Sequence, residues 1–379
     1  MLLLQYPYIV VYFFPFLPGE AIIVPLFIVL TTLVNIGKNQ VSINLPSSIV
    51  VCMVLQAIGW LCFCLFHGDT SYINRTVFIL LGFTSLLMLV KQNRFGQFLV
   101  VNHWWMCLQA IGGAIAFVLV LSGLLQPLQV IMPDDFRVIS FYGITCSNSV
   151  LGNFIRAGGF FDEPGALASW GIFCMLLNKL TYNNKHIELL MMFGLVFTFS
   201  AAYFVLVTMF ILLFYGTKIR SSIIYVLLAS ILIGAVFYGL RDNEQFRYMT
   251  TERFEGGQIR SKRDIAEDSA KKIFNENKMI GIGARNLEKV GEVTSDNPYE
   301  ILAKDGIVGF LITYLPLLFL LIKYRTKKDV VFSTMILMAS YMQRPFHINM
   351  MHFFMLYTFM LAIESKYNNK YQYLINVCK

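Results

Sequence analysis

One segment of the sequence combines charged side chains with glycine and proline in a way that suits chemistry on an anion. It runs from Arg156 to Gly165 (Arg-Ala-Gly-Gly-Phe-Phe-Asp-Glu-Pro-Gly) and leads into an apolar stretch. Pro164 suits the first position of a helix, and Asp162 or Glu163 stands where the cap belongs. The free N–H groups and positive dipole end of such a helix favour an anion, and the glycines admit a bulky ligand. The structural alternative is that Glu163 only caps the helix and Arg156 pairs with a neighbouring carboxylate.

A second segment, Asp-Asn-Pro-Tyr-Glu, precedes another apolar stretch and repeats this arrangement. Asn297 can cap a helix, Pro298 suits its first position, and Glu300 completes a capping box. Asp296 and Tyr299 are left over, although a loop Asp is more often solvated than catalytic. We expect Asn297 and Tyr299 to lie close enough to contact the substrate.

Arginines recur at regular spacings between these two segments. The series comprises Arg241, Arg247, Arg253, Arg260 and Arg263. A diphosphate carries more charge than one arginine neutralises, so several guanidinium groups beside two helix starts could hold one. Arg344, near His347, can complete this set from a later loop. The alternative is that these arginines are solvated loop charges.

The composition indicates whether the chain is soluble or embedded in a membrane. Hydrophobic residues make up 57% of the 379 residues and charged residues 14%, whereas soluble domains carry about 25% charged residues. Repeated long apolar runs favour a single all-α domain, residues 1–379, in a lipid bilayer. The first run, 2–17, lacks a basic n-region and a cleavage site, so we expect a membrane helix rather than a signal peptide.

The seven cysteines fall mostly inside apolar runs, where a thiol behaves as a small hydrophobic group. We therefore expect no disulfide framework. Cys62 and Cys64 are spaced so that their thiols point apart on a helix, and no His or carboxylate lies nearby, so no metal site is expected. The net charge of +8 is scattered among short loops, without the basic, aromatic stripe that would favour nucleic acid.

The apolar runs predict about twelve membrane-spanning helices. They lie near residues 2–17, 21–35, 48–67, 76–90, 104–125, 166–180, 187–199, 201–216, 221–240, 306–322, 330–343 and 351–363. The seventh and eighth are the weakest, because 187–215 could instead form one long tilted helix rather than two short ones meeting near Ser200.

Short loops on the cytoplasmic side of a membrane protein are enriched in Lys and Arg. With twelve spans and the N-terminus inside, the inner loops and the C-terminal tail hold most of the lysines, whereas the short outer loops hold only Arg75 and Arg344. Both termini are thus expected in the cytoplasm, with the long loops 126–163 and 241–300 outside. The outer side is rich in Arg, which suits phosphate better than Lys does. Within it, 262–275 has an amphipathic pattern that predicts a helix lying on the outer membrane surface.

The sequence resembles the membrane polymerases and ligases of bacterial surface polysaccharides, the O-antigen polymerase and ligase type, from about residue 100 onward. Four fragments in a characteristic order carry the resemblance. They are the Arg156 segment through Ala168, Phe197-Thr-Phe-Ser-Ala-Ala-Tyr203, the stretch from Arg253 to Arg260 followed by Asn277-Lys-Met-Ile-Gly-Ile-Gly283, and Asp296-Asn-Pro-Tyr299 with Gly306-Ile-Val-Gly309.

The resemblance implies an enzyme of the bacterial inner membrane, active on its periplasmic face without a metal, cofactor or nucleotide sugar. Its substrates would be undecaprenyl-diphosphate-linked oligosaccharides, and a chain-length regulator protein is an implied partner. In the ligase branch a His followed by Asn, and then a Gly-x-x-Gly-like stretch, marks the expected base. Here Asp296 occupies that position, the stretch to Gly306 is one residue short, and 241–300 contains no His. This departure favours a polymerase.

We therefore expect a polymerase that transfers the growing chain to an incoming lipid-linked repeat unit. Arginines would bind the diphosphate, and Asp296 or, less favoured because it can cap a helix, Glu163 would accept the proton of the acceptor hydroxyl. The alternatives are an O-antigen ligase that transfers polymer to lipid A core, a polysaccharide flippase or transporter, and a noncatalytic membrane scaffold. The long Arg-bearing loop and the scarcity of charges inside the apolar runs argue against transport.

The topology can be tested at Ser269, which it places outside the cell membrane. In a functional background without reactive native thiols, Ser269→Cys should react with a membrane-impermeant maleimide added to intact spheroplasts. Labelling only when the reagent reaches the cytoplasmic side would overturn the predicted topology.

Overall fold

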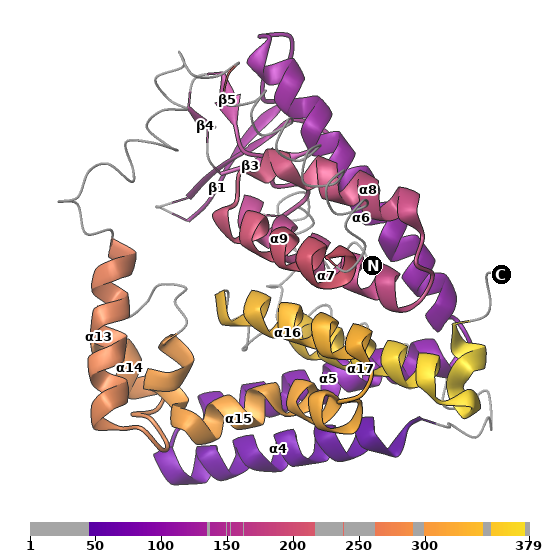
Figure 1. Ribbon diagram of the computed structural model, residues 1–379. Helices are drawn as coiled ribbons and strands as arrows, with labels where there is room; N and C mark the ends of the chain where they lie inside the picture. The colour runs from indigo at the N-terminus through magenta and orange to yellow at the C-terminus, as the bar shows by residue number, and fades with distance from the viewer. Residues whose placement is uncertain are drawn as a thin grey trace. The chain divides into compact units, whose positions relative to one another are not determined.

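The computed structural model describes residues 45–134, 137–148, 150–151, 153–161, 163–216, 238, 262–290, 299–343 and 350–375 (Figure 1). This part of the chain is mostly helical. Four of its helices are long and apolar enough to cross a bilayer: α4 (Ser47–His67), α5 (Ser71–Lys91), α6 (Phe95–Leu121) and α15 (Glu300–Lys323). The chain is thus a helical membrane protein. The runs expected at 2–17, 21–35 and 221–240 lie outside the described residues.

Most of the other described helices follow the remaining apolar runs. These are α7 (Pro164–Leu180), α8 (Lys185–Gly194) with η1 (Leu195–Thr198), α9 (Ala201–Tyr215), α16 (Lys328–Gln343) and α17 (Met350–Tyr367). Three further helices lie outside those runs: α13 (Lys262–Glu276), α14 (Ala284–Val290) and η3 (Asn369–Leu374). Between η1 and α9 the helical backbone is interrupted at Phe199, which has a left-handed conformation with φ 46°. Of the two alternatives for 187–215, the one with two short helices meeting near Ser200 is therefore confirmed. Whether both helices cross the membrane stays a prediction.

The long loop 126–163 contains short strands that the sequence reading did not anticipate. Strands β1 (Gln129–Asp134), β2 (Arg137–Phe141) and β3 (Cys146–Ser147) form an antiparallel sheet in that order, and β4 (Val150–Leu151) pairs with β5 (Phe154–Ile155). The register joins Ile131 to Ile139 and Phe141 to Cys146. The strands have only two to six residues. An alternation of apolar and polar residues over so short a stretch is a weak signal for a strand.

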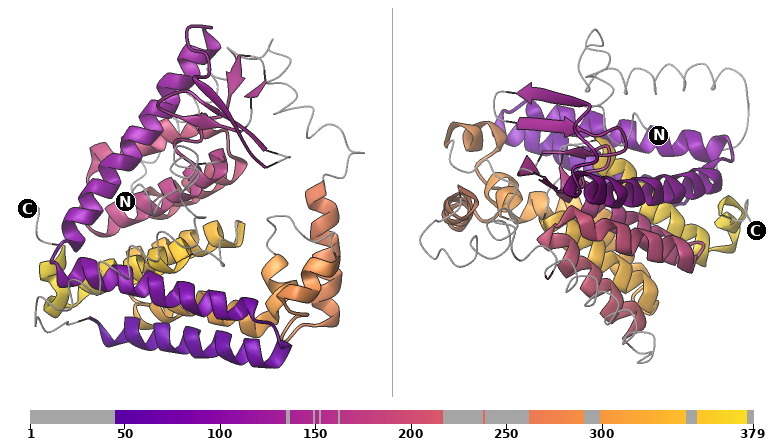
Figure 2. Two further views of the ribbon diagram at one scale, coloured as in Figure 1. Left: turned by 180° about the vertical axis from the view of Figure 1, so that it is seen from behind. Right: turned by 90° about the horizontal axis from the view of Figure 1, so that it is seen from above.

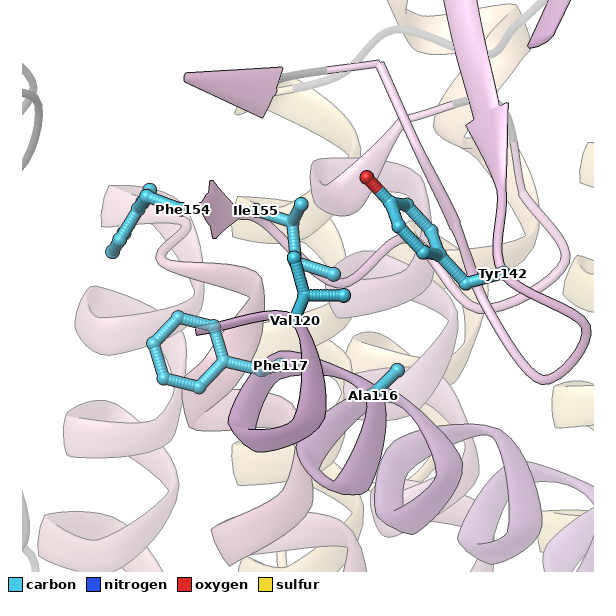
Figure 3. Packing of buried hydrophobic residues seen from close by; sticks show 6 residues of the cluster. All are labelled: Ala116, Phe117, Val120, Tyr142, Phe154 and Ile155. Atoms are coloured by element: carbon cyan, nitrogen blue, oxygen red, sulfur yellow. The ribbon is translucent and has the colours of Figure 1, made fainter. Parts of the chain in front are cut away.

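The described residues form two compact units, which divide between Phe98 and Leu99 inside α6. In the first unit, whose described residues lie within 99–216 and at 238, the strands cover the C-terminal end of α6. Phe117 and Val120 of α6 pack there against Phe154 and Ile155 of β5, with Tyr142 beside them (Figure 3). This apolar contact sets the position of the loop that follows β5 and leads into α7.

The second unit comprises 45–98, 262–290, 299–343 and 350–375, and Figure 2 shows its helices from two further sides. Contacts at the two ends of helix α4 identify the two ends of this unit. Ser48 donates to Glu364 at 2.8 Å, and the His67 ring lies 3.3 Å from the Ile280 carbonyl oxygen. These contacts are separated by 19 residues of α4, or about 28 Å at 1.5 Å per residue. Residues 323–324 and 364 therefore lie at one end of this unit and 280–285 at the other.

Charged side chains close the Glu364 end of the second unit. Glu364 is fully buried, pairs with Lys323 and accepts a hydrogen bond from the Tyr324 hydroxyl at 3.0 Å. At the start of α16, Asp329 pairs with Lys366 at 2.8 Å. These interactions fix the helix ends to one another.

At the opposite end, α15 is interrupted at Gly306, which has φ 64° and ψ −168°. In a continuous helix the N–H groups of Ile307 and Val308 would bond to the carbonyls of Ala303 and Lys304. Here they donate instead to the carbonyls of Lys278 and Met279, at 2.9 and 3.0 Å.

The two carbonyls released by the break are satisfied by the same neighbouring segment. The N–H groups of Ile282 and Gly283 donate to the carbonyls of Ala303 and Lys304, at 3.1 and 2.9 Å. Residues 278–283, the inserted segment, thus replace the missing helical bonds one for one. Only glycines allow this approach, because a Cβ on Gly306 would meet the Met279 backbone and one on Gly281 would meet the Lys304 backbone.

The interruption predicts a large difference between two glycines with positive φ in the same unit. Gly306→Ala should lower the free energy of unfolding by at least about 1–3 kcal/mol from backbone strain, with the clash against Met279 in addition. Gly68→Ala is the matched control, because Gly68 has φ 60° and open space around its Cβ position; strain alone should cost it about 1–2 kcal/mol. Unfolding in detergent measures both, and equal losses would contradict the described break.

Candidate functional site

In the first unit, Arg156 joins two fragments that lie far apart in the sequence. Its Nε donates to the Thr198 carbonyl at 3.0 Å and its Nη2 to the Phe199 carbonyl at 3.2 Å. The N–H of Ala157 donates to the Phe197 carbonyl at 2.9 Å. Arg156 thus holds the break between η1 and α9, where a left-handed residue leaves carbonyls without helical partners.

The glycines after Arg156 bring the loop close to the strands. Gly158 donates to the Cys146 carbonyl at 2.8 Å, and the N–H of Cys146 donates to the Gly159 carbonyl at 2.5 Å. Phe160 donates to Oε1 of Gln109 in α6 at 3.1 Å. A Cβ on Gly158 would meet the Cys146 backbone, so glycine at this position serves contact within the protein itself.

Glu163 stands at the N-cap position of α7 and Pro164 is the first helical residue, as the sequence predicted. Its backbone is extended, with φ −131° and ψ 140°, but its side chain makes no capping hydrogen bond. The part of the structural alternative in which the Glu163 side chain caps the helix is therefore wrong. Glu163 lies beside the positive end of a helix whose body is almost wholly buried.

In the second unit, a buried ion pair lies at the interruption of α15. Asp305 accepts from Arg75 Nη1 at 2.6 Å and from the Tyr72 hydroxyl at 2.7 Å. The side chains of Arg75 and Asp305 are 2% and 0% exposed. Charges at this depth persist only when paired and hydrogen-bonded, so Tyr72, Arg75 and Asp305, the Asp305 cluster, form one interdependent set.

The Asp305 cluster also caps α14, whose first residues follow the inserted segment. Ala284 N–H donates to the Tyr72 hydroxyl at 3.2 Å, and Arg285 N–H donates to Asp69 Oδ2 at 2.9 Å. Partial burial raises the pKa of Asp69, but the N–H groups of Ser71 and Arg285 outweigh burial and bring the pKa below its usual value. Helix α14 is therefore capped by side chains from α5 and the turn before it.

Aromatic rings surround the Arg75 guanidinium, whose carbon lies 4.4 Å from the Trp60 ring centroid and 4.7 Å from that of Tyr72. Within the described part of the chain, Arg75 Nη2 and Trp60 Nε1 have no hydrogen-bond partner. The sequence reading treated Arg75 as a loop charge. The sequence nevertheless held an indication of the pair, because an Arg and an Asp at the ends of apolar runs are expected to form an ion pair.

Of the other predicted site residues, only Tyr299 is described. It lies just before α15, which begins at Glu300 rather than at Pro298, and it packs beside Ala270 and Leu287 with Lys271 Nζ 5.0 Å from its ring centroid. The predicted amphipathic helix is confirmed as α13, but its position on a membrane surface is untested. Outside the described residues lie Arg241, Arg247, Arg253, Arg260, Asp296, Asn297, Arg344 and His347.

The arrangement brings together the fragments on which the family resemblance rests. The Arg156 segment contacts 197–199, and the 277–283 fragment contacts the break before Gly306-Ile-Val-Gly309. Among the described residues, no group of three or more His, Cys, Asp or Glu side chains could hold a metal ion. Comparison with known proteins found no matching family model, no matching curated protein and no matching solved structure. The resemblance to a family therefore rests on the sequence fragments alone.

The Asp305 cluster predicts strong coupling between Arg75 and Asp305. Removing one partner, as in Arg75→Met or Asp305→Leu, leaves a buried charge and should cost about 3–5 kcal/mol, whereas the double variant should cost much less. The half-exposed pair of Lys366 and Asp329 is the control, with an expected coupling of about 0–1 kcal/mol. Unfolding of all variants in detergent gives both coupling energies. Additive losses for Arg75 and Asp305 would contradict the buried pair.

Proposed function

We propose that this protein is an oligosaccharide repeat-unit polymerase. It transfers an undecaprenyl-diphosphate-linked glycan onto an incoming lipid-linked repeat unit at the periplasmic face of the bacterial inner membrane. The observation that carries the proposal is the pairing of the resemblance fragments. In the first pairing, Arg156 donates to the backbone of residues 198 and 199, more than forty positions later in the sequence. In the second, residues 278–283 bond to α15 around Gly306, and Gly281 and Gly306 allow the close approach.

The proposal includes twelve spans with both termini in the cytoplasm. In support, the contacts of α4 put the α4–α5 turn and 280–285 at one end of the second unit, with residues 323–324 and 364 at the other. The Lys/Arg pattern assigns the same two sets of residues to opposite faces.

In the proposed reaction the acceptor sugar hydroxyl attacks C1 of the donor glycan. The bond from C1 to the lipid diphosphate breaks, and the diphosphate leaves with the bonding electron pair, stabilised by the arginines of 241–260 and Arg344. The acceptor proton passes to a carboxylate. Asp296 is the favoured base, and Glu163 is the alternative.

The direct test is to incubate the purified protein in proteoliposomes with lipid-linked repeat units. Ladders of increasing length support the polymerase. A single transfer that depends on an added lipid A core acceptor would instead show a ligase, and movement of the lipid-linked glycan across the bilayer without a new bond would show a transporter. The absence of any product or movement would leave a scaffold.

The arginines should matter beyond their net charge. Arg156→Ala, Arg253→Ala and Arg260→Ala should abolish ladders while the protein still inserts, and Lys at these positions should rescue poorly because it lacks the bidentate fork. Arg156→Lys should also lower the melting temperature, since one ammonium replaces two donors held on Thr198 and Phe199. Normal ladders from all three Lys variants would exclude a diphosphate clamp.

The base can be separated from capping by amide replacements. Asp296→Asn keeps an acceptor oxygen but cannot take a proton, so the variant should fold and lose activity by about 10²- to 10⁴-fold. Glu163→Gln keeps an acceptor oxygen at the start of α7 and should lose less activity. A dead Glu163→Gln enzyme with an active Asp296→Asn enzyme would exchange the two roles. Two active variants would assign catalysis to positioning and the arginines.

A further inference from the structure

The β1–β2 hairpin presents aliphatic side chains on one exposed face. Val130 and Met132 alternate with Ile131, and Val138 is next to Ile139, the strand partner of Ile131. Side chains alternate along strands and Val130 pairs with Ser140, so Val130 and Val138 share a face while Ile139 lies on the other face and is buried. Met132 follows Val130 by two residues within β1, at the register shift between Ile131 and Asp134, and is exposed. Together with exposed Leu128, this face forms the hairpin strip: Leu128, Val130, Met132 and Val138.

The hairpin strip continues an apolar surface that begins on α6. No Asp, Glu, Lys or Arg occurs from Phe95 to Pro133. Helix α6 has 27 residues and is about 40 Å long, enough to cross a hydrocarbon core of about 30 Å. Exposed apolar side chains run along it and past its end to Leu124, which is 78% exposed. Leu128 and Met132, at 69% and 72%, then extend this surface into the hairpin.

The continuity of the hairpin strip with α6 favours lipid over a protein partner. The hairpin strip contains only Leu, Val and Met, and it extends the uncharged apolar surface of a helix that is long and apolar enough to cross a membrane. A surface of this kind beside a membrane-spanning helix can insert among acyl chains without burying a charge. We infer that the hairpin strip docks on the membrane, with its side chains in the boundary between headgroups and acyl chains at the end of α6.

Docking of the hairpin would fix the depth of the loop that bears Arg156. Strand β2 pairs with β3, and Cys146 of β3 exchanges backbone hydrogen bonds with Gly158 and Gly159. The hairpin and the Arg156 loop are therefore one hydrogen-bonded assembly. That this depth matters for a lipid-linked substrate rests on the proposed function; the docking itself does not.

Nitroxide labels can measure the docking directly in the full-length protein in phospholipid vesicles. Cys62, Cys64 and Cys378 are first replaced by Ser, and Cys is then introduced at Leu128, Val130 or Met132 in turn. Gln129 supplies the matched control, because it is also exposed but its side chain alternates to the other face. Relaxation by oxygen, which concentrates in lipid, is compared with relaxation by a water-soluble nickel chelate.

The expected result is an alternation along β1. Labels at Leu128, Val130 and Met132 should relax more with oxygen than with nickel, and the label at Gln129 should show the reverse. Strong relaxation by nickel at all four positions would place the hairpin in water and overturn the inference. Weak relaxation by both reagents at the hairpin strip would also overturn it, because a protein surface would then cover the hairpin. The measurement needs no enzymatic activity, so its failure would leave the polymerase proposal untouched.

Discussion

The structure of the second unit depends on how α15 is completed at its interruption. Unsatisfied peptide groups within a membrane cost several kcal/mol each, so a helix cannot simply stop donating and accepting for one turn. The inserted segment supplies two acceptors and two donors to replace the lost bonds. Gly281 and Gly306 make this possible, because only a residue without a side chain lets the two backbones meet.

The remaining features of that end follow from the insertion. The segment leaves α15 at Gly283 and immediately begins α14, whose first N–H groups bond to Tyr72 and Asp69. Tyr72 is held in turn by Asp305, one residue before the interruption, and Asp305 is neutralised by Arg75. Loss of the buried pair would therefore disturb the cap of α14 and the inserted segment together. These contacts join α5, α14 and α15 in one network.

Lysine and arginine have different tasks in the described parts of the chain. Lys179, Lys323 and Lys366 pair with carboxylates at the ends of helices, where a flexible point charge suffices. Arg156 and Arg75 use their planar guanidinium groups on groups of the protein itself, two backbone carbonyls in one case and a carboxylate between aromatic rings in the other. In the structure, Arg156 therefore holds two backbone segments together, and Arg75 neutralises a buried carboxylate.

Much of the helical fold could be predicted from the sequence, because apolar runs and a proline at a helix start act locally. The start of α7 at Pro164 and the buried face of α13, with Ala266 and Ala270, are examples. The interruption of α15 could not be predicted, since its reason lies in a segment more than twenty residues away. The charges of Arg75 and Asp305, at the ends of apolar runs, gave a signal that they would pair, but the sequence does not show that α4 packs against both α5 and α15 and so brings them together.

Amide hydrogen exchange of the purified protein tests this account of α15 most directly. The N–H groups of Ile282, Gly283, Ile307 and Val308 should be protected to a similar degree and should lose protection together in Asp305→Leu. Protection of Ile307 and Val308 with free exchange at Ile282 and Gly283 would contradict the account, because α15 would then be continuous and the inserted segment would not be part of it.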